Sequence, residues 1–124
     1  FDAVMMTFKL AKDSDEEKEI RRQAIREATL GAAEVPLETA RLAHSLLKHL
    51  PELAKKGNVN TVSDIGVASL LASAACKGAL FNVEINVSSL PEEMGGSLKE
   101  EAVSILESSR ILSRACMDAV RERL

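Results

Sequence analysis

Residues Gly57–Leu90 read GNVNTVSDIGVASLLASAACKGALFNVEINVSSL, and this stretch decides the fold. After a polar loop over residues 58–61, the side chains from Ile65 to Val87 are nearly all apolar or small. An apolar run of this length is typical of the central helix of a bundle. It is also long enough to span a membrane, but Lys77 and Glu84 would then carry charge into the bilayer at a cost of several kcal/mol. We therefore favour a bundle helix.

The helical phase of the run gathers small and polar residues on one stripe. At about 100° per residue, this stripe collects Asp64, Ala68, Leu71, Ala72, Ala75, Gly78, Ala79, Asn82 and Asn86. Its small residues let a second helix approach closely. The polar residues at its ends are either satisfied within a core or line a ligand site. Residues 83–87 alternate apolar and polar, which also fits a short strand, but the run has no turn signal and helix is favoured.

The composition excludes several classes of function. The chain has 124 residues, of which 46% are hydrophobic and 28% charged, so one globular domain with a core is expected. A net charge of −3 offers no basic surface for nucleic acid or anionic membranes. Three Phe without Tyr or Trp cannot build a base-stacking platform. Cys76 and Cys116 lack a paired spacing and no secretory signal is present, so we expect a reducing cytoplasm.

Two helices are predicted before Val35. Residues 1–10 place Phe1, Val4, Met5 and Phe8 on one face, where we expect the methionines to fill the core. Ser14 and Glu17 form a capping box that starts a helix running from residue 15 to about residue 34. Because Phe1 is already in helical register, we expect further sequence upstream of it.

Two more helices flank the apolar run. Val35-Pro36 predicts a boundary or a kink, followed by a helix from Pro36 to about Lys56 that Gly57 caps. Pro51 is a second possible kink. After a connection over residues 88–97, a last helix should begin near Ser97 and reach the C-terminus.

Residue patterns alone predict an all-α fold, a multi-helix bundle with a long apolar central helix, but no reaction. His44 and His49 are about 140° apart around a helix axis, which does not suit a metal pair, and we expect no metal. The chain contains no phosphate-binding glycine loop, zinc signature or nucleophile elbow.

A set of motifs supplies the missing function. The segments GNVNTVSDIGVA and GALFNVEIN, preceded by EVPLETA, resemble the cyclodeaminase/cyclohydrolase family, which comprises the helical domain of formiminotransferase-cyclodeaminase and its stand-alone microbial relatives. The resemblance spans essentially the whole chain, so we treat residues 1–124 as a single helical cyclodeaminase-like domain. The matching positions are Gly57, Asn58, Ser63, Asp64, Phe81, Asn82, Val83, Ile85 and Asn86, with Val35, Pro36 and Leu37 upstream.

The resemblance implies folate chemistry. Family members close formiminotetrahydrofolate to methenyltetrahydrofolate with release of ammonia, or act as methenyltetrahydrofolate cyclohydrolases. The substrate is a tetrahydrofolate derivative, and both reactions need proton transfer at a one-carbon unit held between two folate nitrogens. A positioned carboxylate can perform this transfer as general acid and base.

The candidate site residues follow from the motifs. Asp64 is the candidate acid and base or pterin anchor, and its alternative role is to stabilise the N-terminus of its helix. The candidate substrate-binding residues are Asn58, Asn60, Ser63, Asn82 and Asn86. The alternative for the asparagines is buried hydrogen bonding between helices. Lys77 either attracts the glutamate tail of folate or is a surface lysine.

The sequence departs from the family pattern at its beginning. The resemblance implies a Pro-Gly-Gly-Gly segment, and an aspartate that transfers the proton, before the phenylalanine that matches Phe1. Both would precede residue 1, so we expect the N-terminal part of the family domain to be missing. The alternative function is a non-catalytic interaction module, or an inactive fragment, on the same fold.

The spacing of the candidate residues predicts a homodimer or a higher homo-oligomer, and the alternative is that the small-residue stripe packs on helices of its own chain. Asp64 and Asn82 are 18 residues apart, which is about 27 Å along a helix, so one helix cannot place both on one small ligand. A two-fold dimer can, if two central helices cross antiparallel near Ala72–Ala75 and each site takes residues from both subunits.

Overall fold

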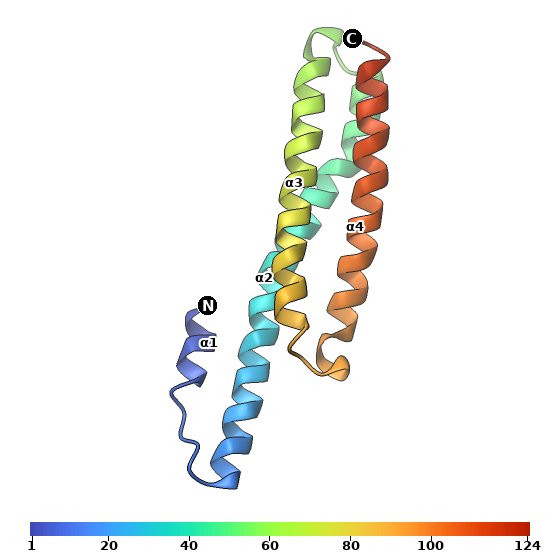
Figure 1. Cartoon of the computed structure of the whole chain (residues 1–124). Helices are drawn as coiled ribbons and strands as arrows, with labels where there is room; N and C mark the ends of the chain where they lie inside the picture. The colour runs from blue at the N-terminus through green and yellow to red at the C-terminus, as the bar shows by residue number, and fades with distance from the viewer.

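A computed structural model describes residues 1–124 and contains helices and turns but no strand. In chain order the elements are α1 (Asp2–Thr7), α2 (Asp15–Lys56), the 3-10 turn η1 (Val59–Thr61), α3 (Val62–Val87) and α4 (Glu92–Arg121). In Figure 1, α2, α3 and α4 form an elongated bundle, and α1 lies beside the N-terminal half of α2, which extends beyond the other two helices. The predicted all-α bundle with one long apolar helix is confirmed.

The beginning of α2 is fixed by the predicted capping box. The Ser14 hydroxyl accepts a hydrogen bond from the Glu17 backbone N–H at 3.1 Å, and the Glu17 carboxylate accepts one from the Ser14 N–H at 3.2 Å. The same carboxylate accepts from the Asp13 N–H at 2.8 Å. These bonds satisfy N–H groups that have no partner within the helix.

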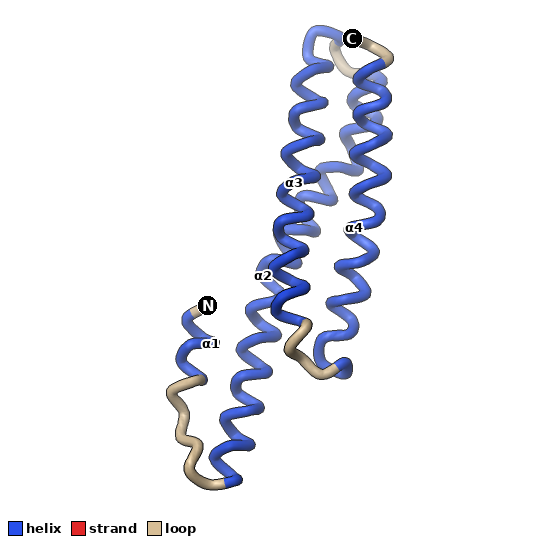
Figure 2. The backbone as a smooth tube through the Cα atoms, viewed as in Figure 1, coloured by secondary structure: helices blue, strands red, loops and turns tan.

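α2 continues through both of its prolines. The predicted division into two helices at Val35-Pro36 is wrong, because residues 15–56 form a single helix of 42 residues. A proline removes one backbone donor and crowds the turn before it, yet packing against α3 and α4 holds the turns on either side in place. Figure 2 shows α2 as one continuous helix that bends along its length.

The apolar run forms α3, so the helical interpretation of residues 83–87 is confirmed and the strand alternative is wrong. The connection that follows is shorter than predicted, because α4 begins at Glu92 and not near Ser97. Gly95 and Gly96, which suggested a loop, are buried within the first turns of α4. A Cβ on Gly95 would lie 3.2 Å from the Leu90 Cβ, so the glycine lets the connection cross close to the helix.

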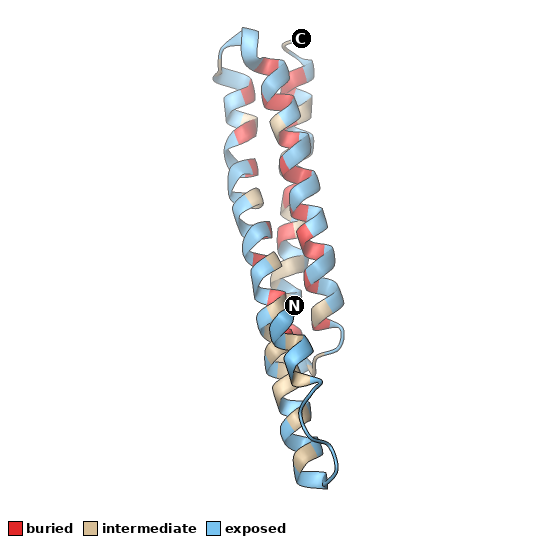
Figure 3. Cartoon of the chain, turned by 90° about the vertical axis from the view of Figure 1, so that its left-hand side faces the viewer, coloured by how far each residue is buried: buried red, intermediate tan, exposed pale blue.

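The core forms two clusters along the three-helix bundle. One joins Ala33, Leu37 and Ala40 of α2 to Cys76, Ala79, Leu80, Val83 and Val87 of α3 and Ile105 of α4. The other joins Leu47, Leu50 and Ala54 to Val62, Ile65 and Ala72 and to Cys116, Ala119 and Val120. Cys76 and Cys116 are free thiols. Only 25 of the 124 residues are buried, because each long helix touches two others and turns its remaining face outward, as the exposed colouring of Figure 3 shows.

The end of α2 is closed by a residue from the far end of the chain. Gly57 is the C-terminal cap, as predicted, and its N–H donates to the Leu53 carbonyl at 2.7 Å. The Arg123 guanidinium donates to the carbonyls of Ala54 at 2.6 Å and Gly57 at 2.9 Å. These bonds satisfy carbonyls that lack helical partners and tie the C-terminus to the turn between α2 and α3.

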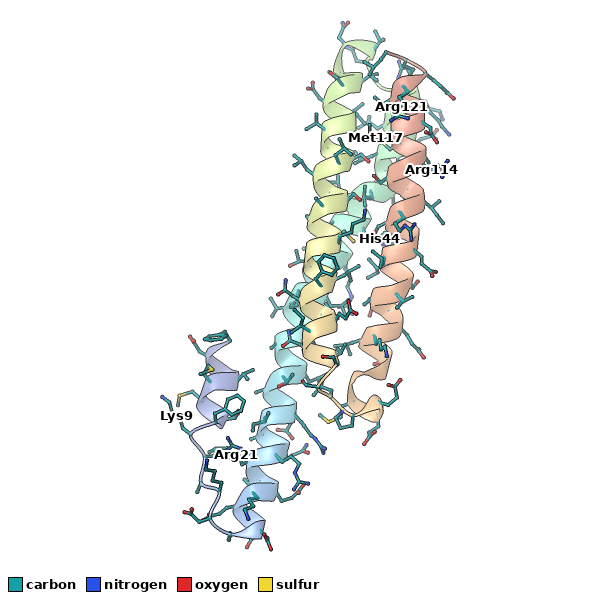
Figure 4. The ribbon with its side chains drawn as sticks, in the orientation of Figure 1. Lys9, Arg21, His44, Arg114, Met117 and Arg121 are labelled. Carbon is teal, nitrogen blue, oxygen red and sulfur yellow. The ribbon has the colours of Figure 1, made fainter.

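The short helix α1 packs against α2 alone. The Arg21 guanidinium lies 5.4 Å from the centre of the Phe8 ring and donates to the Phe8 carbonyl at 3.5 Å, and Figure 4 shows Arg21 pointing from α2 toward α1. The expectation that Met5 and Met6 fill the core is wrong, because α1 has no buried residue.

The segment Val59–Val87 is long and apolar enough to cross a membrane, judged by length and composition. Of its most apolar window, 44% is buried inside the bundle. A single helix of this kind is weak support for a membrane span, because a bundle helix passes the same test. The contacts of α3 with both α2 and α4 are those of a bundle helix.

Candidate functional site

An open groove of about 760 Å³ runs between α1, α2 and α3. Phe1 and Val4 at the start of the chain line it, together with Val35, Pro36 and Thr39 of α2 and Ala75, Gly78 and Ala79 of α3. Asn82 and Asn86 of α3 add two amide side chains to the hydroxyl group of Thr39. The structure therefore brings the EVPLETA and FNVEIN motifs to one place, although they are far apart in the sequence.

Only the Nδ2 atoms of these two asparagines form hydrogen bonds within the chain. The Asn82 Nδ2 donates to the Gly78 carbonyl at 3.1 Å, and the Asn86 Nδ2 donates to the Asn82 carbonyl at 2.8 Å and to the Ala32 carbonyl of α2 at 3.4 Å. The Oδ1 atoms of both side chains accept no hydrogen bond. Because these amides are oriented by backbone carbonyls, the groove presents two free acceptors.

The other candidate residues lie at the opposite end of α3. The Asn58 side chain caps η1 by accepting from the Asn60 N–H at 3.0 Å. Ser63 and Asp64 follow in the first turn of α3 and are exposed. No hydrogen bond or ion pair in the structure engages the Asp64 carboxylate. It is therefore placed to stabilise the helix N-terminus and is also free to contact a ligand.

One chain does not bring the two groups of candidate residues together. Asp64 and Asn82 belong to one continuous helix and are 18 residues apart, which is about 27 Å. Asn58, Asn60, Ser63 and Asp64 form one group, and Asn82 and Asn86 form the other. The residues of the first group and Asn82 are exposed, and Asn86 is half-buried.

The face of α3 between the two groups is exposed and apolar. Leu71 is 66% exposed and Ile85 71%, with Ala75 and Gly78 exposed between them. Of the predicted stripe, Ala72 and Ala79 belong instead to the core of their own chain. The exposed leucines of α2, namely Leu42, Leu46 and Leu53, lie on the same side of the helix as Val35 and add to this face.

A second groove of about 520 Å³ lies between α3 and α4. Its floor is apolar, and Lys77, Glu84, Glu92 and Lys99 stand along its lining. The opposite charges offset one another, so Lys77 does not create a basic patch there. Its suggested contact with a folate glutamate tail stays a prediction.

A two-bond ion pair links α2 to α4, away from both groups of candidate residues. The Arg41 guanidinium binds Glu101 at 2.6 and 2.7 Å and Glu38 at 3.1 Å, and these bonds lower the pKa of Glu101 and raise that of Arg41. The His44 Nε2 contacts the Ser108 Oγ at 2.8 Å. His44, labelled in Figure 4, is half-buried, and His49 is exposed.

No group of three or more His, Cys, Asp or Glu side chains is placed to hold a metal ion. The polar groups described at the candidate site are the Asp64 carboxylate and the amide acceptors of Asn82 and Asn86, beside apolar walls.

Comparison with known proteins decides the family. The family model described as Formiminotransferase-cyclodeaminase matches residues 1–104. The chain belongs to the formiminotransferase-cyclodeaminase family. The resemblance that the motifs predicted is thus confirmed, and the match includes every candidate site residue.

Individual relatives of this chain carry two kinds of name. A methenyltetrahydrofolate cyclohydrolase of Methylorubrum extorquens is 38% identical over 124 residues, covering 100% of this chain and 56% of its own length. The formimidoyltransferase-cyclodeaminase of Sus scrofa is 32% identical over 124 residues, covering 99% of this chain and 23% of its own length. The formimidoyltransferase-cyclodeaminase of Rattus norvegicus is 35% identical over 94 residues, covering 76% of this chain and 17% of its own length. The chain spans about half the length of the first relative and less of the others.

The residue patterns do not predict part of the groove. Thr39 and Phe1 line it beside Asn82, but neither stands out by residue type or spacing. The Val35-Pro36 pair is a usable signal, because it belongs to the family motif. Its local pattern predicts a helix boundary or a kink and does not indicate that the pair lines the groove.

Proposed function

We propose that the whole protein is a folate-dependent one-carbon enzyme, either a formiminotetrahydrofolate cyclodeaminase or a methenyltetrahydrofolate cyclohydrolase. The observation that carries this proposal is the 38% identity to a methenyltetrahydrofolate cyclohydrolase along the entire chain, within a family match over residues 1–104. A tetrahydrofolate derivative is the substrate in both cases. The free thiols of Cys76 and Cys116 support a cytoplasmic location.

Asp64 is the proposed acid and base of the chain. Its carboxylate is exposed and free of protein partners, so it can approach a one-carbon unit and exchange a proton with the nitrogen that joins or leaves it. Asn58, Asn60 and Ser63 precede it in the chain, at η1 and the start of α3, and would offer amide and hydroxyl groups to the same ligand.

Asn82 and Asn86 are the residues proposed to bind the pterin. Their free Oδ1 atoms suit the N–H donors at the edge of a reduced pterin, and the neighbouring Ala75, Gly78 and Ala79 leave room for a flat ring. Binding there would orient the one-carbon unit, and orientation is a large part of the catalysis of such ring closures.

A homodimer would unite the two groups. Ala72 is buried in its own chain, so the crossing point of two α3 helices must lie at the exposed Ala75. Asp64 and Asn86 each stand 11 residues from Ala75. An antiparallel two-fold pairing about this residue therefore sets Asp64 of one subunit against Asn86 of the other. The exposed apolar face of α2 and α3 is the surface that this pairing would bury.

Turnover of two substrates tests the proposed function. The purified protein is given formiminotetrahydrofolate, with ammonia release as the readout, and methenyltetrahydrofolate, with loss of its absorbance as the readout. We expect conversion of one of them. A folded protein that binds and converts neither would contradict the proposal and support the non-catalytic alternative.

Asp64→Asn tests the assignment of the acid and base. We expect turnover to fall about 10²–10⁴-fold, while the free energy of unfolding changes by about 1 kcal/mol or less. Asp15→Asn is the matched control, because Asp15 is also an exposed carboxylate in a first helical turn, and it should leave turnover unchanged. Full turnover by Asp64→Asn would make this carboxylate structural.

A further inference from the structure

Pro36 leaves a carbonyl of α2 without its helical donor. A residue in an α-helix normally donates its N–H to the carbonyl four positions earlier, and proline has no N–H. Pro36 stands inside α2, so the carbonyl of Ala32 loses this bond. Ala32 is half-buried against α3, where an unpaired carbonyl is unfavourable.

A side chain from another helix supplies the missing donor. The Nδ2 of Asn86, on α3, lies 3.4 Å from the Ala32 carbonyl oxygen, and the two residues are 54 positions apart in the chain. A second hydrogen bond, to the Asn82 carbonyl at 2.8 Å, holds the same amide group in place. At the other proline of α2, Pro51, no side chain donates to the corresponding carbonyl of Leu47.

We infer that Asn86 is a positioning residue that replaces, for Ala32, the donor removed by Pro36. The bond joins α2 to α3 where α2 continues through its proline, and Ala32, Pro36, Asn82 and Asn86 all line the groove there. Asn86 thereby holds the two walls of the groove at a fixed separation. This inference concerns the shape of the groove and goes beyond the proposed function.

A double-mutant cycle tests the inference without any ligand. We expect Asn86→Ala to lower the folding equilibrium constant about tenfold, because it leaves the Ala32 carbonyl unpaired. In a Pro36→Ala background Asn86→Ala should lower the folding equilibrium constant only about twofold or less, because the new N–H at position 36 pairs with the Ala32 carbonyl. Unfolding in urea measures this constant for the parent, the two single variants and the double variant. If Asn86→Ala fails to fold and the double variant folds, the rescue is complete and supports the same conclusion.

Two controls separate this coupling from general effects. Pro51→Ala should not change the penalty of Asn86→Ala, because Pro51 affects a different carbonyl. Asn82→Ala should lower the folding equilibrium constant equally with and without Pro36, because the Asn82 amide donates to the Gly78 carbonyl within α3. An equal penalty for Asn86→Ala in both backgrounds would overturn the inference.

Ligand affinity adds a readout that depends on groove shape. At a temperature where all variants are folded, Asn86→Ala should raise the Kd for tetrahydrofolate, and so should Pro36→Ala, because its new N–H competes for the Ala32 carbonyl and weakens the bond between α3 and α2. A Kd that Pro36→Ala leaves unchanged would show that the amide acts on the ligand alone and does not position the groove. This arm rests on the proposed function, whereas the urea cycle does not, so a protein that does not bind folate leaves the urea cycle decisive.

Discussion

At the scale of single residues, His44 gives the fold a pH dependence. Burial, and secondarily the positive charge of Lys48, lower the pKa of His44 below its ordinary value of 6.5. The unfolded chain therefore takes up this proton at a higher pH than the folded chain does. We expect the free energy of unfolding to be fully retained above pH 6.5 and to fall as the pH drops from there toward the folded pKa.

Urea unfolding at a series of pH values measures this effect. His44→Gln should remove the corresponding part of the slope between neutral and mildly acidic pH. His49→Gln, on the exposed side of the same helix, is the control and should retain it. A slope that is the same in His44→Gln and the parent would assign the pH dependence to other groups.

Gly57 is required by its surroundings and not by its backbone angles. Its φ is −69°, which any residue adopts, but a Cβ would lie 2.6 Å from the Leu53 carbonyl oxygen. We expect Gly57→Ala to destabilise the protein by about 1–3 kcal/mol, as overpacking does. Thermal or urea unfolding measures this. An unchanged stability would mean that the turn after α2 shifts freely despite the bonds from Arg123.

At the scale of elements, the predictions succeeded where local chemistry decides and failed where another helix does. The start of α2 follows from Ser14 and Glu17, which act on their own turn. The supposed break at Pro36 does not occur, because α3 and α4 pack on both sides of it and Asn86 supplies a donor. The predicted start of α4 is too late, because Gly95 and Gly96 are typical of a loop. In the structure both are buried in the first turns of α4, where a Cβ on Gly95 would crowd Leu90.

Gly78 tests whether α3 meets another helix on its exposed side. Within one chain a Cβ on Gly78 would meet nothing within 4 Å, so Gly78→Ala should stabilise an isolated chain by about 1 kcal/mol through helix propensity. If two α3 helices cross closely here, the added methyl group weakens their contact. We expect a higher melting temperature in dilute solution and a smaller gain, or a loss, in concentrated solution. The same gain at every concentration would contradict a close crossing at Gly78.

At the scale of the whole molecule, the sequence identified the family and both groups of candidate residues but not their arrangement. The sequence motifs are enough to identify Asp64 and Asn82 as candidate site residues. The distance between them follows from one unbroken helix, and the wall opposite Asn82 comes from Pro36 and Thr39, which no local pattern connects to it. In the proposed dimer the two groups meet across the subunit contact, whose geometry the pattern of one chain does not encode.

Ala75→Trp tests the proposed contact between two α3 helices by placing a large side chain at their crossing point. Ala75 is exposed in one chain, so the variant should fold, but a tryptophan at the proposed crossing should separate the dimer. Sedimentation of parent and variant measures this. Ser104→Trp, at an exposed position of α4, is the matched control and should leave the assembly unchanged. A dimer that persists in Ala75→Trp would place the contact elsewhere.

Mixing two inactive variants tests whether each site is shared. Asp64→Asn and Asn82→Ala should each be inactive alone, because every site then lacks one group. A mixed dimer contains one site with both defects and one site with neither, if the two groups come from different subunits. With free exchange of subunits, half of the dimers are mixed, so about a quarter of the parent activity should return. Sites built within one chain would give no recovery, and neither would subunits linked by a disulfide or cross-linker before mixing. Recovery that appears only after subunit exchange is therefore the signature of residues 64 and 82 acting across the two-fold axis.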